Sequence, residues 1–249
     1  ESSAKRLAMP AAGSEEAHIM WNLWLGVWIA VLVVFVVVFA MIMYAPIRYR
    51  RRDTDAPAPP QIRYNLPLEA LYTIAPVIMV AVFFFHVVDV QDQVTREVEN
   101  PDHTIEVVGS KWQWTFNYLQ PEATAGEGVF DEGTPEALPK LYLPVNESVR
   151  FEMHSPDVIH SFWIPEFYYK LDVVPGVIPG IDGPSNFTMT PDRKGVFTGR
   201  CAELCGTYHS RMMFEVHVVD RAEYDKHMQE LQAEGQIGRP RGTDDATTV

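Results

Sequence analysis

The sequence predicts an α+β membrane protein: a two-helix transmembrane hairpin, then an extracytoplasmic β-sandwich or barrel, then a C-terminal helix. Two long apolar stretches near the N-terminus and seven short β-rich runs after them support this fold class. The chain has 249 residues and a formal charge of −13. This acidic balance argues against nucleic-acid binding, and two cysteines are too few for a disulfide-built fold.

The first apolar stretch, residues 19–47, contains no Asp, Glu, Lys, Arg or His, and about 20 such residues span a bilayer. Aromatic side chains lie toward its ends, as in spanning helices: Trp21, Trp24, Trp28 and Tyr44. The second helix is predicted over residues 67–88, where Ala70 to Val88 has only His86 as an ionisable residue. Pro76 is tolerable in a membrane helix. A buried core helix is the alternative for each stretch, but a helical hairpin explains both together.

The linker between the helices, residues 48–66, predicts the topology. It carries five arginines close to the membrane ends: Arg48, Arg50, Arg51, Arg52 and Arg63. Such clusters stay in the cytoplasm, so residues 1–18 and everything after about Asp89 are expected outside. From Asp89 onward there are 27 acidic and 13 basic residues, so this portion carries a net charge of −14. Glu1 in place of Met is what removal of an export signal predicts, although trimming would give the same start.

The outer portion divides into a β domain at residues 89–220 and a C-terminal helix and tail at residues 221–249. Seven runs predict a sandwich or barrel: TIEVVGS, WQWTFNY, PKLYLPV, SVRFEMH, SNFTMT, GVFTGR and MMFEVHVV. The polar segment at residues 120–139 is predicted to be a long excursion. Residues 221–234 favour a helix, and Gly235 onward favours a mobile tail.

A metal-binding pattern lies in GRCAELCGTYHSRMMF. Cys201, Cys205, His209 and Met212 fall within one loop, and His160, after the run SVRFEMH, could close a site from a neighbouring loop. Thiolate and thioether ligands together favour copper. A disulfide, a structural zinc held by two Cys and two His, and a mononuclear blue-copper site remain alternatives. Two copper ions bridged by both thiolates, each completed by one histidine, would use every residue.

The helical hairpin, KWQWTF, DVIHSFWIP and CAELCGTYHSRM together resemble subunit II of the cytochrome c oxidases of the haem-copper family, in a bacterial form. The resemblance covers roughly residues 21–224. It implies a cupredoxin-type β-barrel that holds the dinuclear copper centre CuA, with haems only in partner subunits. CuA would take electrons from a c-type cytochrome and pass them to haem a of subunit I, where oxygen reduction is coupled to proton pumping.

The resemblance implies copper ligation by six residues: His160, Cys201, Glu203 through its carbonyl, Cys205, His209 and Met212. It also implies that the Glu203 side chain binds magnesium at the contact with subunit I. Without the motif, Glu203 would be an exposed loop residue. Asp157 supports the His160 loop or is simply a turn residue; the sequence leaves both readings open.

Two further residues are candidates for transfer steps. Trp112 alternates with Trp114, Phe116 and Tyr118, a pattern usual for a packed strand face, but the resemblance places it where electrons enter. Glu69 could stabilise the N-terminus of the second helix through its negative charge, while the resemblance matches it to the entrance of a proton pathway.

The implied partners are oxidase subunits I and III, the lipid bilayer of a bacterial plasma membrane, and a cytochrome donor. That donor would be soluble or attached to a cytochrome bc complex in a supercomplex. The loop at residues 174–187 is longer than in the mitochondrial form and could contact the donor.

Overall fold

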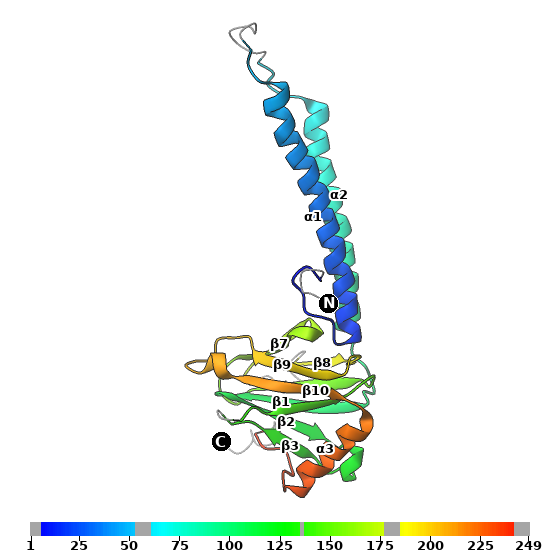
Figure 1. Cartoon of the computed structure of the whole chain (residues 1–249), viewed down its shortest axis with the longest axis vertical. Coiled ribbons are helices and arrows are strands. Elements are labelled where there is room, and N and C mark those ends of the chain that lie inside the picture. The colour runs from blue at the N-terminus through cyan, green and yellow to red at the C-terminus, as the bar shows by residue number, and fades with distance from the viewer. Residues whose placement is uncertain (1–5, 53–60, 135–136, 177–184, 242–249) are drawn as a thin grey trace. The chain divides into compact units, whose positions relative to one another are not determined.

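The computed structural model describes residues 6–52, 61–134, 137–176 and 185–241 (Figure 1). The chain divides into two compact units. A β-rich unit comprises Glu1–Ile19 and Val94–Val249, and a helical unit comprises Met20–Gln93. The expected cytoplasmic loop and the extended 174–187 loop lie partly outside the described residues, and the end of the tail lies wholly outside them.

The two apolar stretches form α1 (Glu15–Arg48) and α2 (Leu66–Val94). Both helices extend beyond the predicted ranges at both ends. Their most apolar windows have mean hydropathies of 3.1 and 2.3, and both helices are long enough to cross a membrane. The side chains in these windows are not buried within the chain. Apolar helices left uncovered in this way need lipid or other apolar helices around them.

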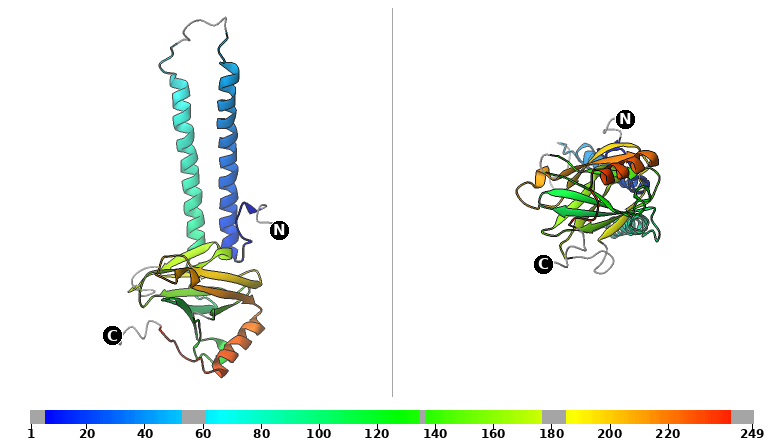
Figure 2. Two further views of the ribbon diagram at one scale, coloured as in Figure 1. Left: turned by 60° about the vertical axis from the view of Figure 1, so that its left-hand side comes forward. Right: turned by 90° about the horizontal axis from the view of Figure 1, so that it is seen from below.

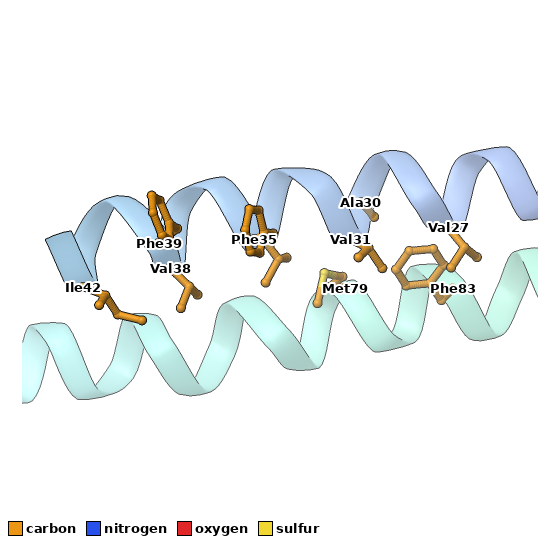
Figure 3. Close-up of a pocket in the computed structure, with 10 residues that line it drawn as sticks. Val27, Ala30, Val31, Phe35, Val38, Phe39, Ile42, Met79 and Phe83 are labelled. Atoms are coloured by element: carbon orange, nitrogen blue, oxygen red, sulfur yellow. The ribbon is translucent and has the colours of Figure 1, made fainter. Parts of the chain in front are cut away.

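An apolar groove of about 460 Å³ lies between the two helices (Figure 3). Valine, phenylalanine and other apolar side chains of α1 form most of its wall, and Met79 and Phe83 contribute from α2. In the close-up, the side chains of Val31 and Val38 point toward α2. The groove therefore offers a surface suited to acyl chains or to a further transmembrane helix.

The β-rich unit is a sandwich of two five-stranded sheets. The first sheet has the order β3 (Val129–Glu132), β2 (Gln113–Leu119), β1 (His103–Ser110), β5 (Val149–His154) and β8 (Asn186–Met189). The second has the order β4 (Lys140–Pro144), β10 (Met213–Val219), β9 (Gly195–Cys201), β6 (His160–Ile164) and β7 (Tyr169–Val173). The β1–β5 and β10–β4 pairs are parallel and the other pairs are antiparallel.

All seven predicted runs form strands, and three further strands were not predicted. β3 lies inside the segment expected to be an excursion, while β6 and β7 follow the SVRFEMH run. β6 begins at His160 itself, so this histidine belongs to a strand and not to a loop.

Aromatic rings fill the space between the sheets. Trp114 and Phe116 on β2, Phe162 on β6 and Phe214 on β10 are all almost fully buried. Phe162 stacks on Phe214 with centroids 4.9 Å apart, and Trp114 meets both rings edge to face. Such pairs add about 0.5–1.5 kcal/mol each beyond area burial, so they stabilise the core next to the strand ends that carry the cysteine motif.

The chain after β10 forms α3 (Arg221–Ala233) and then a strap, which we define as residues 236–241. α3 packs against β3, β4 and the short helix η2 (Glu122–Thr124), with Tyr224, Met228 and Leu231 buried (Figures 1 and 2). The strap pairs with β3 and crosses the outer face of the first sheet, where Arg239 forms an ion pair with the fully buried Glu106. The prediction of a mobile tail from Gly235 is therefore wrong for the strap.

The N-terminal segment belongs to the β-rich unit. The Glu16 carboxylate accepts a hydrogen bond from the Thr190 N–H, and the Arg193 guanidinium donates to the carbonyls of Ala11 and Ala12. These contacts tie the segment before α1 and the first turn of α1 to the connection between β8 and β9.

Candidate metal centre

Three neighbouring strands of the second sheet bring the candidate ligands together. Cys201 is the last residue of β9 and pairs with Phe162 of β6, which places His160 at the adjacent end of β6. The chain then loops through Cys205 to the short helix η4 (His209–Arg211), and Met212 precedes β10. The Cys201 N–H donates to the Met212 carbonyl and so closes the loop at its base.

Sulfur and nitrogen atoms of this loop face one another. The two Sγ atoms are 3.9 Å apart, with His160 Nδ1 3.9 Å from Cys201 Sγ and His209 Nδ1 3.6 Å from Cys205 Sγ. Met212 Sδ lies 3.8 Å from Cys205 Sγ. The ligand atoms of His160, Cys201 and Cys205 all lie within 4.8 Å of one another. Each thiol therefore has its own imidazole.

The Glu203 backbone carbonyl also faces this cluster, 3.2 Å from Cys201 Sγ, while the Glu203 side chain is exposed. The backbone atom and the side chain of this residue are thus available to different partners.

The geometry argues against a disulfide. Both cysteines are free and buried, and their separation is nearly twice a bonded S–S length. Two ligands at about 2.3 Å from one tetrahedral ion lie about 3.8 Å apart, so the separation suits sulfurs that share a metal.

The electrostatics favour a thiolate at Cys201. Burial raises the pKa of this thiol, but the hydrogen bonds with His160, with the Ser161 and Glu203 backbone and with His209 together outweigh it, and the pKa falls to about 7. Burial and the neighbouring Cys201 raise the pKa of Cys205. A soft cation that binds both sulfurs would allow Cys205 to lose its proton as well, since metal ligation deprotonates thiols.

The donor set fits copper. Zinc needs only the two thiolates and two imidazoles, and would leave the Met212 sulfur beside Cys205 without a role. Thiolate, imidazole and thioether together are the ligands that copper prefers.

Asp157 holds His160 in place. Its Oδ1 lies 2.9 Å from His160 Nε2, which leaves Nδ1 to face the thiols, and its Oδ2 accepts the Lys111 N–H at 2.8 Å. Burial raises the pKa of Asp157, but these two bonds, a bond from the Val158 N–H and the charge of His160 together outweigh it, and the pKa is lowered. Burial acts to lower the pKa of His160. The hydrogen bonds of His160 with Cys201 and Asp157 act to raise it, and the pKa lies above its usual value. Asp157 is thus more than a turn residue.

Trp112 lies outside the strand in which its alternation with Trp114 predicted it. Ser110 pairs with Gln113, so Lys111 and Trp112 form a two-residue turn between β1 and β2. The half-buried indole donates to the Cys205 carbonyl at 3.2 Å and meets Tyr208 edge to face at 4.9 Å. The turn therefore places this ring directly against the cysteine loop.

Sequence reasoning missed two contacts at the centre. Tyr208 covers Trp112, and the indole N–H of Trp114 donates to the Met212 carbonyl at 3.4 Å. Neither has a signal in the local pattern, because each joins segments more than 90 residues apart.

Glu69 is in the first turn of α2, in the helical unit. Its Oε1 accepts the Asn65 N–H at 2.9 Å, and Asn65 Oδ1 accepts the Leu68 N–H. Glu69 therefore supports the helix start, which was one of its two predicted roles.

Two family descriptions match this chain. Residues 103–219 match "Cytochrome C oxidase subunit II, periplasmic domain", and residues 2–87 match "Cytochrome C oxidase subunit II, transmembrane domain". The chain belongs to the cytochrome c oxidase subunit II family.

Curated relatives agree with this membership. The subunit is 40% identical to a "Probable cytochrome c oxidase subunit 2" of Streptomyces avermitilis, over 94% of this chain and 81% of the relative. It is 30% identical to the cytochrome c oxidase subunit 2 of Mycobacterium tuberculosis, over 92% of this chain and 76% of the relative.

Solved structures include the periplasmic domain of oxidase subunit II of Bradyrhizobium japonicum, with 26% identity and a TM-score of 0.47. It is matched over 55% of this chain and 99% of its own. A haem-copper terminal oxidase dimer matches at 18% identity and a TM-score of 0.34, over 78% of this chain and 97% of its own.

Several expectations are confirmed. This subunit II is a membrane protein with two transmembrane helices, a periplasmic domain built as a β-sandwich and a C-terminal helix. It is a component of an oxidase complex with other subunits, and its family implies a copper centre.

Proposed function

We propose that this subunit II is the electron-entry subunit of its oxidase. His160, Cys201, Cys205, His209, Met212 and the Glu203 carbonyl would hold a dinuclear CuA centre. The observation that carries the proposal is the pairing of the sulfurs: two unbonded Sγ atoms 3.9 Å apart, each faced by a different imidazole Nδ1. When bound, the copper pair supplies a one-electron redox site for transfer from a c-type cytochrome to haem a of subunit I, whose oxygen chemistry is coupled to proton pumping.

The protein's own residues would keep this site nearly unchanged between redox states. Asp157 fixes the His160 ring, and the Cys201 N–H bond to the Met212 carbonyl fixes the loop base. Buried aromatic rings exclude water from the inner side. Restricting ligand movement reduces the rearrangement that an electron transfer must overcome.

Electron entry is assigned to Trp112. Its indole N–H reaches the Cys205 carbonyl, so the ring is one hydrogen bond from a ligand residue while part of it remains exposed. The donor would be a c-type cytochrome, soluble or attached to a cytochrome bc complex.

Two further roles belong to the complex. The exposed Glu203 carboxylate would bind magnesium at the contact with subunit I, since carboxylate oxygens suit this ion. Glu69 would receive protons at the cytoplasmic start of α2. The apolar groove between α1 and α2 suits contact with subunit I, with subunit III or with lipid.

The proposed setting is a bacterial plasma membrane, with both termini and the β domain outside. The five arginines between the helices support this orientation. The contacts of Ala11, Ala12 and Glu16 with the β domain agree with an N-terminus on the same side.

The test is metal analysis with electron paramagnetic resonance on the full chain in detergent, reconstituted with copper. We expect two coppers per chain that share one unpaired electron, and a seven-line hyperfine pattern. Cys201→Ser should lose this signal, whereas His217→Gln, a histidine away from the cluster, should retain it. One copper with a four-line signal would indicate a mononuclear carrier. Zinc in preference to copper, or a Cys201–Cys205 disulfide that reduction does not convert to a copper site, would indicate a structural domain.

A further inference from the structure

A polar cavity lies between the sandwich and α3, apart from the cysteine loop. Its volume is about 280 Å³, and its lining includes Asp131 of β3, Lys140 and Tyr142 of β4, and His227 of α3. Glu230, Glu234 and Gln236 complete its polar wall. β3 and α3 lie next to each other in the same unit (Figures 1 and 2).

Two polar atoms of this cavity are buried without a partner. Neither His227 Nε2 nor Gln236 Oε1 has a hydrogen-bond partner among the described residues. The His227 side chain is only 12% exposed. A buried polar atom that bonds to nothing costs about 1–3 kcal/mol, so these two atoms call for a ligand in the cavity.

The distance between His227 and Asp131 suits an ion between them. His227 Nε2 and Asp131 Oδ2 are 3.9 Å apart, which is too long for a hydrogen bond. Two ligand atoms at about 2.1 Å from a shared tetrahedral ion lie about 3.4 Å apart, so the two side chains would close by about 0.5 Å around an ion. The Asp131 side chain is 16% exposed, so both groups are largely removed from water.

Neighbouring groups hold both side chains in position. The His227 ring stacks on Tyr142 with centroids 3.7 Å apart, and the Lys140 N–H donates to Asp131 Oδ1. The Gln236 backbone bonds to Phe130 and to Leu231, so its side chain is anchored at the cavity wall.

α3 supplies the further ligands. Glu230 lies one turn after His227 on the same face of α3, where it also pairs with Lys226, and Glu234 is the C-cap residue just after the helix. With Asp131 they bring three carboxylates to a cavity whose opposing charge is Lys140. Imidazole with carboxylates is a donor set that zinc and similar divalent ions accept.

We propose that this cavity is a second metal site, which binds a divalent transition-metal ion through His227 Nε2 and Asp131 Oδ2, completed by Glu230, Glu234 or Gln236. The ion would fasten α3 and the start of the strap to β3. This site shares no residue with the cysteine loop and does not depend on the function proposed above.

The test uses zinc and the full chain in detergent. Cys201 and Cys205 are both replaced by Ser in every sample, so that zinc cannot bind at the thiols. Zinc affinity is measured by competition with a chromophoric chelator, and bound metal is counted after dialysis. We expect one zinc per chain and a metal-dependent rise in the melting temperature.

Matched variants locate the ion. His227→Gln should weaken zinc binding at least about tenfold and abolish the rise in melting temperature. His217→Gln should change neither, because His217 stacks on the same Tyr142 but does not line the cavity. Glu230→Gln with Glu234→Gln is a second variant in exposed positions, and it should also weaken binding if His227→Gln fails to fold.

Two outcomes would overturn the proposal. One is a parent protein that retains no zinc against the chelator, which would indicate a cavity filled by water. The other is zinc binding that neither the His227 variant nor the double glutamate variant weakens, which would place the ion elsewhere.

Discussion

Asp157 connects the proposed copper ligands to the residue proposed for electron entry. One carboxylate oxygen bonds to His160 Nε2 and the other to the Lys111 N–H, next to Trp112. A carboxylate behind a ligating imidazole fixes the orientation of the ring and makes it a stronger donor. The geometry of the centre and the position of the indole therefore depend on the same side chain.

Replacing Asp157 by Asn should weaken the centre while leaving the fold intact. The amide cannot support the His160 Nε2–H as a carboxylate does, so we expect copper affinity to fall about 10–100-fold and the reduction potential to rise. Copper competition and voltammetry would measure these changes. Asp220→Asn is the control, because Asp220 is exposed and pairs only with Lys194 among the described residues. Unchanged affinity and potential in Asp157→Asn would contradict the positioning role.

Glu69→Gln separates a proton-transfer role from a structural one. Gln can still accept the Asn65 N–H through its own oxygen, so the start of α2 should be retained. It cannot carry a proton as a carboxylic acid does, so oxidase turnover should slow with the copper spectrum unchanged. Assays of the whole oxidase, with the spectrum recorded on the same sample, would decide. A changed copper spectrum would mean that Glu69 acts through folding.

At the scale of elements, the strap explains why both faces of β1 and β2 are buried. One face of β2 packs into the sandwich, while Asn117 on the other face donates to the buried Glu106 and to the Pro240 carbonyl. Arg239 meets Glu106 through two N–H···O contacts of 2.7 and 2.9 Å. The strap thus covers the outer face of the first sheet with a buried, bidentate ion pair.

Arg239→Met should destabilise the β domain by about 3 kcal/mol, because it leaves the buried Glu106 carboxylate without its guanidinium. Adding Glu106→Gln should restore part of the loss. Thermal and denaturant unfolding of the full chain would measure both effects. Arg241→Met should cost at most about 1 kcal/mol, since the Arg241 side chain is 45% exposed and its pair with Glu132 is screened. Equal losses for the two arginine variants would argue against a special role for Glu106.

Helix α3 should give the domain an acid-sensitive contact when no metal is bound. Burial, with Lys140 and His217 nearby, lowers the folded pKa of His227 to about 4 despite Glu230, whereas an unfolded histidine titrates near 6.5. Stability from this group is therefore present above pH 6.5 and lost as the pH falls toward 4. Burial raises the pKa of Asp131 to about 6, which acts in the opposite direction, because the folded chain then holds a proton that the unfolded chain has released.

His227→Gln should remove the loss of stability in acid that His227 causes and leave the opposite contribution of Asp131. Relative to the wild type, the variant should gain about 1–3 kcal/mol as the pH falls from 7 to 4.5, with chelator present throughout. Melting temperatures across this range would show the gain. His18→Gln is the matched control because His18 is 59% exposed. A stability difference between variant and wild type that does not change with pH would contradict the assignment.

At the scale of the whole molecule, local patterns predicted most of the fold. Long apolar runs identified both helices, and four of the candidate ligands were visible because they lie within one loop. β3 escaped prediction because four residues, VFDE, carry no alternation in a segment rich in Gly and Pro. The strap escaped because Arg239 and Glu106 are 133 residues apart. Contacts of that separation depend on the folded sheet and leave no mark on local spacing.

The net charge of the outer portion leads to a prediction about the donor. From Asp89 onward the chain carries a net charge of −14, which should speed encounter with a basic cytochrome. Charges at the surface are screened beyond about 10 Å in 0.1 M salt, so reduction by a soluble basic cytochrome should slow about tenfold or more as salt rises from low to moderate concentration. Stopped-flow reduction of the copper-loaded chain would measure this, with an uncharged small reductant as the salt-independent control. A cytochrome held permanently in a supercomplex would instead transfer electrons at a rate that salt leaves unchanged, because no diffusional encounter is needed. The salt dependence in the native membrane therefore distinguishes the two proposed donors.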